Sequence, residues 1–363
     1  MSELPNRIRV LDSFRAIAAL GVLWIHIWTI HGQPKVYFHN MDILMPINIV
    51  GNGVDLFFVI SGFCMYYFYA KSSNFSSNNF FGFLVKRWQR LSPVFYFCTL
   101  VYILIFSHSS GLQNILKFLT SVFYLNSISP YNAEGFMWSL GTEWQFYLII
   151  PILLIYQNKL GFNRTISLIT IIFLLISIVS VLILGSKSDF LTDQIIFRYF
   201  EFLWGIIIGR LFLLGYVPKL NANLLVVVFA IMAYTGRFFL TDSILQHGGA
   251  YRNLIKIVGY NLMSMGFAGL IYICLTLNNF LKKLIDNKLF SFIGKISYSF
   301  YLWHGLVHIM IGNYLIKNLS KHGDFKLAII NFIVSSILLI PISYASYYIF
   351  EVRAYHLLQK RNK

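Results

Sequence analysis

Long apolar runs alternate with short polar segments along the whole chain. A helix rises 1.5 Å per residue, so roughly 20 apolar residues cross the ~30 Å hydrocarbon core of a membrane. Runs of about this length recur between polar breaks, which predicts an all-α, polytopic transmembrane helix bundle of about ten spans. The expected spans are approximately 11–31, 46–69, 93–107, 136–156, 165–185, 194–214, 222–240, 253–275, 290–315 and 327–350.

The polar segments are too short to fold as separate soluble domains, so residues 1–363 are predicted to form a single integral membrane domain. The composition agrees, because 58% of the residues are hydrophobic, 12% are charged and the mean hydropathy is +0.68. The first run follows two arginines as a secretion signal would. It nevertheless contains His26 and has no convincing small-residue cleavage site before His31, so we expect it to be retained as a span.

The formal net charge of +16 comes from basic residues spread over many polar breaks, so a nucleic-acid partner is not expected. With a cytoplasmic N-terminus, the cytoplasmic breaks hold 17 Lys and Arg residues and the opposite breaks hold 9. This bias predicts that both termini are cytoplasmic and that membrane lipids surround the basic residues. The three cysteines are expected to be small buried hydrophobic side chains; they are Cys64, Cys98 and Cys274.

An arginine and a histidine lie inside the first apolar run, LDSFRAIAALGVLWIHIW. Arg15 and His26 are separated by about 20° more than three helical turns, so they share one helix face roughly 16 Å apart along the axis. Ionisable groups inside a span are costly unless they face a cavity or a partner, which favours a functional site. The alternatives are an arginine that extends to interfacial water and a histidine in a helix–helix contact.

A second group of charges lies in the polar break VKRWQRLSP. If this segment is helical, Arg87 and Arg90 lie one turn apart and bind one polyanion together. Guanidinium groups suit phosphate oxygens. The alternative is a membrane anchor that contacts anionic lipid, as basic residues beside a span commonly do.

A third group lies in WSLGTEWQFYL at residues 138–148. Glu143 stands among apolar and aromatic residues with Ser139 one turn before it, and an unpaired carboxylate there is costly. A structural ion pair and a catalytic or substrate-binding role both remain open for Glu143. Further along, Arg198 and Glu201 are three residues apart on one expected span, where they are expected to pair with each other.

Four other polar residues have more ordinary interpretations. Asp55 follows two glycines and is expected either to bind an arginine such as Arg15 or to cap a helix. His304 and His308 are one turn apart, but no further ligand lies in their segment, so no metal is expected. Glu351, beside an arginine at the end of the last span, is expected to be solvated.

Taken together, these segments resemble the acyltransferase 3 family of integral membrane acyltransferases. The motifs occur in the order that the family shows, from about Leu11 to Glu351. They are Arg15-x10-His26, GVDLFFVISGF, Arg87-x-x-Arg90, WSLGTEWQFYL and IGKISYSFYLWH. The closing motif departs from the common E-x-P, because it reads Glu351-Val352-Arg353, which leaves the role of Glu351 in doubt. A chain that ends at Lys363 resembles the stand-alone members without a fused SGNH domain.

The resemblance implies an acyl-CoA-dependent O-acyltransferase of the bacterial inner membrane. Such proteins use cytoplasmic acetyl-CoA as the acyl donor and acylate carbohydrates such as O-antigen or exopolysaccharide. The resemblance and the chemistry of the residues together predict that Arg15, Arg87 and Arg90 bind the donor and that His26 is the general base. Glu143 is expected to orient the imidazole or to bind the sugar. The sequence does not identify the carbohydrate acceptor or say whether it is free or lipid-linked. Acetyl is the acyl group that the resemblance implies by default.

A membrane transporter or flippase is the competing hypothesis, with the buried charges forming a proton or substrate pathway. Its sequence signs would be inverted repeats and paired broken helices, and the sequence shows neither. A structural or partner-recruiting membrane protein is the third hypothesis, but it would not require several buried charges. The enzyme hypothesis accounts for the most residues.

Overall fold

The computed structural model describes residues 8–38, 41–42, 51–70, 75–319, 324–354 and 357. Residues 46–50 of the second expected span lie outside these ranges. Several basic residues that contribute to the predicted orientation also lie outside the described residues: Arg7, Lys71, Lys321, Lys360, Arg361 and Lys363.

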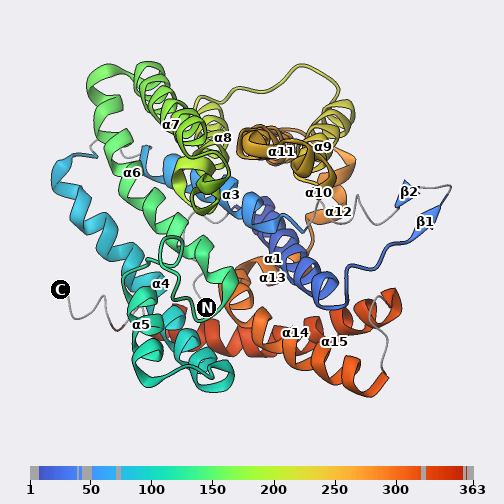
Figure 1. Ribbon diagram of the computed structural model, residues 1–363. Helices are drawn as coiled ribbons and strands as arrows, with labels where there is room; N and C mark the ends of the chain where they lie inside the picture. Colours follow the sequence, from blue (N-terminus) through green and yellow to red (C-terminus); the bar gives the residue numbers. More distant parts are fainter. Residues whose placement is uncertain are drawn as a thin grey trace. The chain divides into compact units, whose positions relative to one another are not determined.

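Each of the ten expected spans corresponds to a long helix in the described part of the chain (Figure 1). These helices are α1 (Arg9–Ile30), α3 (Gly53–Ala70), α4 (Phe80–Phe106), α6 (Trp138–Leu160), α7 (Phe162–Leu184), α8 (Ile195–Leu213), α9 (Ala222–Phe239), α11 (Arg252–Thr276), α14 (Ser297–Leu319) and α15 (Phe325–Ser346). The predicted all-α membrane bundle is therefore confirmed.

Shorter elements connect the long helices. The α-helical ones are α5 (Gly111–Val122), α10 (Asp242–His247), α12 (Phe280–Ile285) and α13 (Lys288–Lys295). The 3-10 turns are η1 (Ser77–Asn79), η2 (Gly135–Met137), η3 (Gly185–Leu191) and η4 (Gly249–Tyr251), and η5 (Tyr347–Ala354) is a π-helix that continues α15. Two antiparallel two-residue strands, β1 (Tyr37–Phe38) and β2 (Met41–Asp42), are the exception to the helical pattern.

Eight helical segments are long and apolar enough to cross a membrane. They are Arg9–Ile30, Gly53–Ala70, Phe80–Phe106, Gly135–Leu160, Phe162–Leu191, Ala222–Phe239, Gly249–Thr276 and Phe325–Ala354. Two of the expected spans, α8 and α14, are helices of similar length that are not among these eight segments. Helix α8 carries three charged residues, and α14 is rich in histidine and tyrosine.

The segment that carries Arg87 and Arg90 differs from the expected loop. It is part of α4, which begins at Phe80 and continues as one helix through Pro93 to Phe106. The expected span beginning near residue 93 is therefore the second half of a longer helix. Because this segment is helical, Arg87 and Arg90 lie one turn apart on α4.

The chain divides into two compact units, each assembled from segments that are far apart in the sequence. The first unit comprises Met1–Phe57, Arg90–Tyr102 and Phe280–Lys363. The second unit comprises Phe58–Gln89 and Ile103–Asn279. Helices α3 and α4 contribute residues to both units.

Helix α1 is central to the first unit, where it packs against α13, α14 and α15. Two glycines allow backbones to approach it closely. A Cβ atom on Gly294 of α13 would overlap the carbonyl oxygen of Asp12, and one on Gly53 of α3 would overlap that of Ala18. Only glycine has no Cβ, so these contacts set the position of α1.

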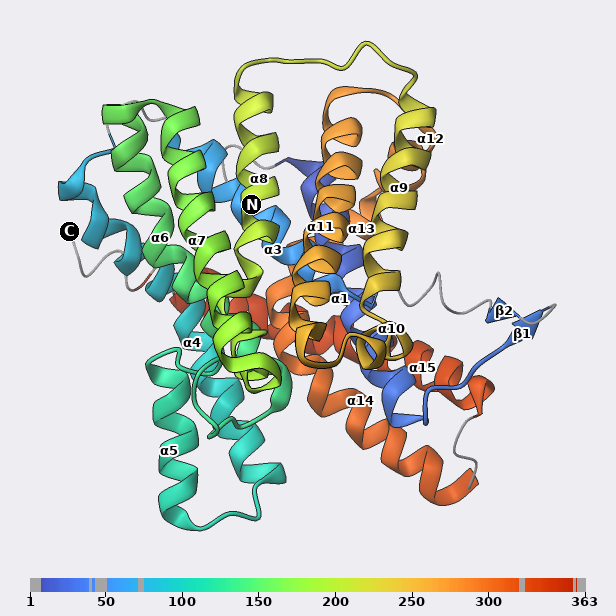
Figure 2. The same cartoon turned by 45° about the horizontal axis from the view of Figure 1, so that its top comes forward.

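The second unit contains a close crossing of α3 and α8. A Cβ atom on Gly62 would overlap the carbonyl oxygen of Phe202, and one on Gly205 would overlap that of Val59. The ring of Phe146 on α6 stacks on Phe202 with centroids 4.1 Å apart, which ties α6 to the same crossing. Helices α9 and α11 of this unit run side by side (Figure 2).

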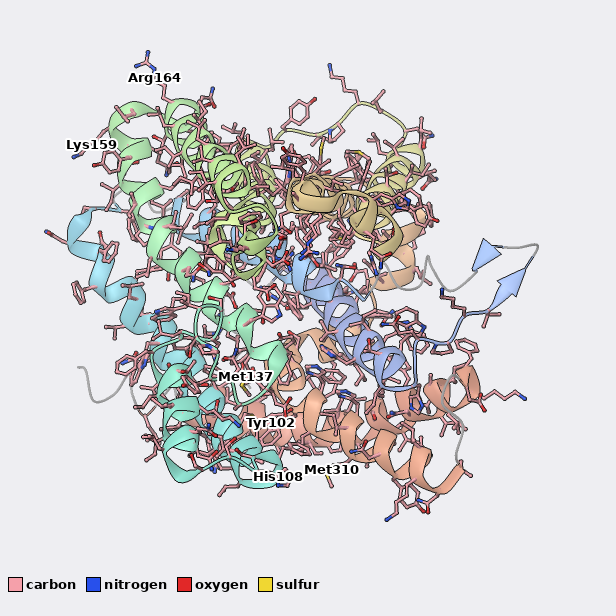
Figure 3. All side chains as sticks on the ribbon, in the orientation of Figure 1. Tyr102, His108, Met137, Lys159, Arg164 and Met310 are labelled. Carbon is pink, nitrogen blue, oxygen red and sulfur yellow. The ribbon has the colours of Figure 1, made fainter. Side chains whose placement is uncertain are left out.

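Helix α6 begins among buried apolar residues and ends beside exposed basic residues. Its first residue follows the buried Met137. Its last turn leads into α7 through a connection flanked by Lys159 and Arg164 (Figure 3). Both basic side chains are exposed. They belong to the set of charges that predicts the cytoplasmic side.

Candidate active site

Arg15 and His26 both lie on α1, as the helical spacing predicts. The Nη1 atom of Arg15 lies 3.0 Å from Oδ1 of Asp12, a buried carboxylate one turn earlier on the same helix. The Arg15 side chain remains 28% exposed. The ion pair therefore orients a guanidinium that a ligand can still reach.

Two further histidines surround His26. The ring centroids of His26 and His304 are 5.1 Å apart, and those of His26 and His308 are 5.7 Å apart. His304 and His308 are themselves separated by 5.7 Å and are both buried, while His26 is half-buried. Three imidazoles from α1 and α14 thus form one cluster in the first unit, which we call the histidine cluster.

The sequence analysis considered these histidines separately. The spacing of His304 and His308 predicted that they share a helix face, where a metal site was considered and not expected. Nothing in the sequence linked that face to His26. Within the described ranges, no group of three or more His, Cys, Asp or Glu residues is arranged to hold a metal ion. The structure instead brings the pair beside the candidate base.

Backbone carbonyl groups set the proton positions on the two α14 histidines. Nδ1 of His304 is hydrogen-bonded to the carbonyl oxygen of Tyr301, and Nδ1 of His308 lies 2.8 Å from that of His304. A carbonyl oxygen only accepts hydrogen bonds, so each Nδ1 carries the proton. In the neutral rings Nε2 then carries the lone pair.

The turn of α14 that carries His304 is held by a tyrosine of α4. The hydroxyl of Tyr102 donates to the carbonyl oxygen of Leu302 at 3.0 Å and accepts from the backbone N–H of Leu306 at 2.6 Å. An ordinary helical turn pairs these two backbone groups with each other. Tyr102 is fully buried, so this turn and its imidazole have a defined position.

The other end of the histidine cluster is fixed by an asparagine of α15. Nδ2 of Asn331 donates to Nε2 of His31 at 3.1 Å and to the carbonyl oxygen of His308 at 3.3 Å. The Asn331 carbonyl oxygen accepts from Ser335 at 2.8 Å. All of these side chains are buried, so the network ties α1, α14 and α15 together around the cluster.

Arg87 and Arg90 lie in different surroundings on α4. The Arg87 guanidinium lies 5.5 to 6.0 Å from the ring centroids of Tyr69, Phe83 and Tyr147, and Nη2 donates to the Tyr69 hydroxyl at 2.9 Å. Within the part of the chain that the structure describes, Nε of Arg87 is buried without a hydrogen-bond partner. Arg90 is exposed.

Glu143 lies on α6 in the second unit and has two hydroxyl partners. Its Oε1 accepts from the Ser61 hydroxyl at 2.9 Å and from the Tyr147 hydroxyl. Ser139 instead donates to the carbonyl oxygen of Phe136 at 3.2 Å. Because Tyr147 also lies beside the Arg87 guanidinium, the structure links two of the sequence-predicted site residues, Glu143 and Arg87, within one unit.

The expected pairing of Arg198 with Glu201 is confirmed. Nη1 of Arg198 lies 2.6 Å from Oε1 of Glu201, and the side chains are 5% and 0% exposed. The guanidinium also lies 3.8 Å from the ring centroid of Tyr260 and 4.9 Å from that of Trp138. This buried pair joins α6, α8 and α11.

Two other carboxylates accept hydrogen bonds from neighbouring side chains. Asp55, in the first turn of α3, accepts from Nδ2 of Asn52 at 3.0 Å. Glu351 was expected to be solvated, but it is half-buried and accepts from the Ser299 hydroxyl at 2.7 Å. Glu351 therefore has a hydrogen-bond partner on α14 of the first unit.

The membrane-length helices define an integral membrane protein with ionisable side chains held inside it. Residues 8–348 match the acyltransferase domain that defines the acyltransferase 3 family. The chain belongs to this family.

Curated relatives agree with this membership. The O-acetyltransferase OatA of Staphylococcus aureus (strain NCTC 8325 / PS 47) is 26% identical over 342 residues, covering 86% of this chain and 52% of the relative. A putative O-acetyltransferase of Staphylococcus aureus (strain COL) is 25% identical over 347 residues, covering 84% of this chain and 51% of the relative. The chain thus spans about half the length of these relatives. No solved structure matches the chain.

Proposed function

We propose that this protein is an O-acetyltransferase of the bacterial inner membrane with both termini in the cytoplasm. It moves an acetyl group from cytoplasmic acetyl-CoA to a hydroxyl of a cell-envelope or exported carbohydrate, such as O-antigen or exopolysaccharide. Family membership and the names of the relatives support acetyl transfer to oxygen. The observation that carries the proposal is the half-buried imidazole of His26, inside a span and beside two buried imidazoles.

The proposed donor-binding residues are the three arginines of the family motifs. Acetyl-CoA is anionic at its nucleotide end, so Arg87 and Arg90 would bind its phosphates from one turn of α4. The buried Nε donor of Arg87 and the exposed side chain of Arg90 fit this role. Arg15 would contact the pyrophosphate or the pantetheine arm with its guanidinium, on a side chain that is 28% exposed.

The proposed chemistry is direct transfer with His26 as the general base. The neutral imidazole takes the proton of the acceptor hydroxyl as its oxygen attacks the thioester carbonyl carbon. The carbon–sulfur bond breaks, and the thiolate of CoA leaves and receives the proton from the imidazolium. An ester and CoA with a free thiol result, so His26 returns to its starting state.

Glu143 is proposed to act on the carbohydrate. One of its oxygens already accepts from Ser61 and Tyr147, which fixes the carboxylate while its other oxygen can accept from a sugar hydroxyl. The proposal requires only that the acceptor, free or lipid-linked, has hydroxyl groups that can donate to this carboxylate. Glu143 would therefore affect the Michaelis constant for the acceptor more than that for acetyl-CoA.

Transfer of labelled acetyl tests the function as a whole. Inverted membrane vesicles that contain the protein are expected to move radiolabel from [¹⁴C]acetyl-CoA to envelope glycan, and mild alkali should release the label because it cleaves esters. Vesicles without the protein are the control. Uptake of a glycan or a proton without any ester-linked label would contradict the enzyme and support a transporter.

Replacement of both α4 arginines tests the donor site. We expect Arg87→Ala with Arg90→Ala to raise the KM for acetyl-CoA by about 10²- to 10⁴-fold, because two charge-assisted hydrogen bonds of about 1.5–3 kcal/mol each are lost. The matched control is Lys86→Ala, which removes an exposed positive charge from the same helix and should leave KM within about twofold. An unchanged KM in the double variant would contradict donor binding and support the alternative that Arg87 and Arg90 contact anionic lipid.

A further inference from the structure

Helix α5, in the second unit, has one apolar side and one polar side. Leu112, Ile115, Leu119 and the residue that ends the helix, Phe123, recur every three or four positions. At 100° per residue they lie within an arc of about 80°, which we call the apolar face of α5. The other side of the helix carries Asn114, Lys117, Thr120 and Ser121.

The burial of the two sides is the reverse of that in a water-soluble protein. There an amphipathic helix buries its apolar side and exposes its polar side. In α5 the four residues of the apolar face are 42% to 69% exposed, whereas Thr120 and Ser121 are 6% and 0% exposed. The apolar face is therefore turned away from the rest of the protein.

Hydrogen bonds on the polar side hold α5 in this orientation. Nζ of Lys117 donates to the hydroxyls of Ser107 and Ser109, at 3.0 Å in both cases. The hydroxyl oxygens of Thr120 and Ser129 are also 3.0 Å apart. Turning the apolar face inward would break these bonds and bury apolar side chains against hydroxyl groups, so the exposure of this face is built into the fold.

The surface that precedes α5 indicates what covers the apolar face. In the last turn of the membrane-length helix α4, Leu104 is 82% exposed and Ile105 is 50% exposed, so this turn faces lipid. Only residues 107–110 separate the end of α4 at Phe106 from the start of α5. The apolar face thus begins within a few residues of a lipid-facing surface, at the end of a helix long enough to reach the edge of the membrane.

The length and charge of α5 fit a position at that edge. Its 12 residues extend about 18 Å, which is too short to cross the ~30 Å hydrocarbon core. Its one charged residue, Lys117, lies on the polar side. A short helix with a wide apolar face and its charge on the opposite side is the form that lies in the plane of a membrane surface.

We propose that α5 is an interfacial helix whose apolar face docks on the lipid acyl chains of the membrane leaflet in which α4 ends. The partner is the bilayer itself, and the apolar face continues the lipid-facing surface of α4. The inference goes beyond the proposed function and holds whether or not the protein transfers acetyl groups.

This docking also bears on the candidate site, through the chain that follows α5. The ring of Tyr124 stacks on that of Trp144 with centroids 4.5 Å apart, and the hydroxyl of Ser127 accepts from Nε2 of Gln145 at 3.0 Å. Trp144 and Gln145 directly follow Glu143 on α6. An α5 docked on lipid therefore ties the turn of α6 that carries Glu143 to the same leaflet.

Spin labels on single introduced cysteines test the docking in the full-length protein. The variants Leu112→Cys, Ile115→Cys and Leu119→Cys are labelled with a nitroxide and reconstituted into vesicles of phosphatidylethanolamine and phosphatidylglycerol. Oxygen concentrates in acyl chains, whereas a nickel chelate stays in water. We expect these three labels to relax more with oxygen than with the chelate, at a depth of about 5–10 Å below the headgroup boundary.

Matched positions provide the controls for this measurement. Gln113→Cys lies on the same helix and is exposed, but outside the apolar face, so its label should relax more with the chelate. Leu104→Cys provides the reference for a lipid-facing label. Cys64, Cys98 and Cys274 are buried, so the protein without an introduced cysteine should take up little label.

Two results would overturn the inference. If the labels at positions 112, 115 and 119 relaxed mainly with the chelate, as at position 113, the apolar face would lie in water. If both reagents were excluded at these positions, another protein would cover the face, and dipolar broadening between labels would identify a second copy of this chain. Size-exclusion profiles in detergent show which variants fold, and the three positions report independently of one another.

Discussion

Replacing His26 by alanine is expected to lower kcat by about 10²- to 10⁴-fold, which is the contribution of a positioned general base. The donor site lies on other residues in our proposal, so the affinity for acetyl-CoA should change by less than about twofold. Initial rates in proteoliposomes and calorimetric titration with CoA measure the two quantities separately. Loss of turnover with retained binding would identify His26 as a group that acts in the chemical step.

A second histidine provides the control for this substitution. His108 is exposed on the connection between α4 and α5 (Figure 3) and is not one of the three residues of the histidine cluster. His108→Ala should retain wild-type kcat and KM. Near-normal turnover in His26→Ala, with His108→Ala also normal, would refute the assignment of the base.

Replacing Arg198 by alanine is expected to lower the free energy of unfolding by about 3–5 kcal/mol. The Glu201 carboxylate is 0% exposed, so removing its partner leaves a charge in a medium that cannot solvate it. The substitution also removes the guanidinium from the faces of Tyr260 and Trp138. Reversible unfolding with sodium dodecyl sulfate in mixed micelles measures the loss.

A paired substitution shows whether the unpaired charge is the cause. In Arg198→Met with Glu201→Leu, both charges are replaced by apolar side chains of similar length, and most of the lost stability should return. Arg164→Ala, at the exposed connection between α6 and α7, should change the free energy of unfolding by less than about 0.5 kcal/mol. A double variant as unstable as Arg198→Ala would show that side-chain packing, not charge, is decisive.

Features that depend on the helical repeat alone were predictable from the sequence. The positions of the ten long helices follow from the apolar runs, the shared helix of Arg15 and His26 follows from their spacing, and the pair of Arg198 with Glu201 follows from a separation of three residues. Each of these depends on residues a few turns apart, whose geometry is fixed once a helix forms.

The start of α4 was not predictable in the same way. The residues between Phe80 and Pro93 were expected to form a polar break before a span that begins near residue 93. The structure instead continues the helix, because aromatic side chains cover the Arg87 guanidinium and the Tyr69 hydroxyl binds it. Packing against other segments outweighed the local composition.

The sequence by itself determined the membrane class through the length of its apolar runs, and its motifs indicated the family and the candidate base, because runs and motifs are local properties. Only the tertiary structure decided what surrounds that base. His26 lies 278 positions before His304 in the chain, and Ser61 lies 82 positions before Glu143, so no periodicity relates them. Their contacts arise because glycines let particular helices approach closely, and that choice of neighbours depends on the packing of the whole unit.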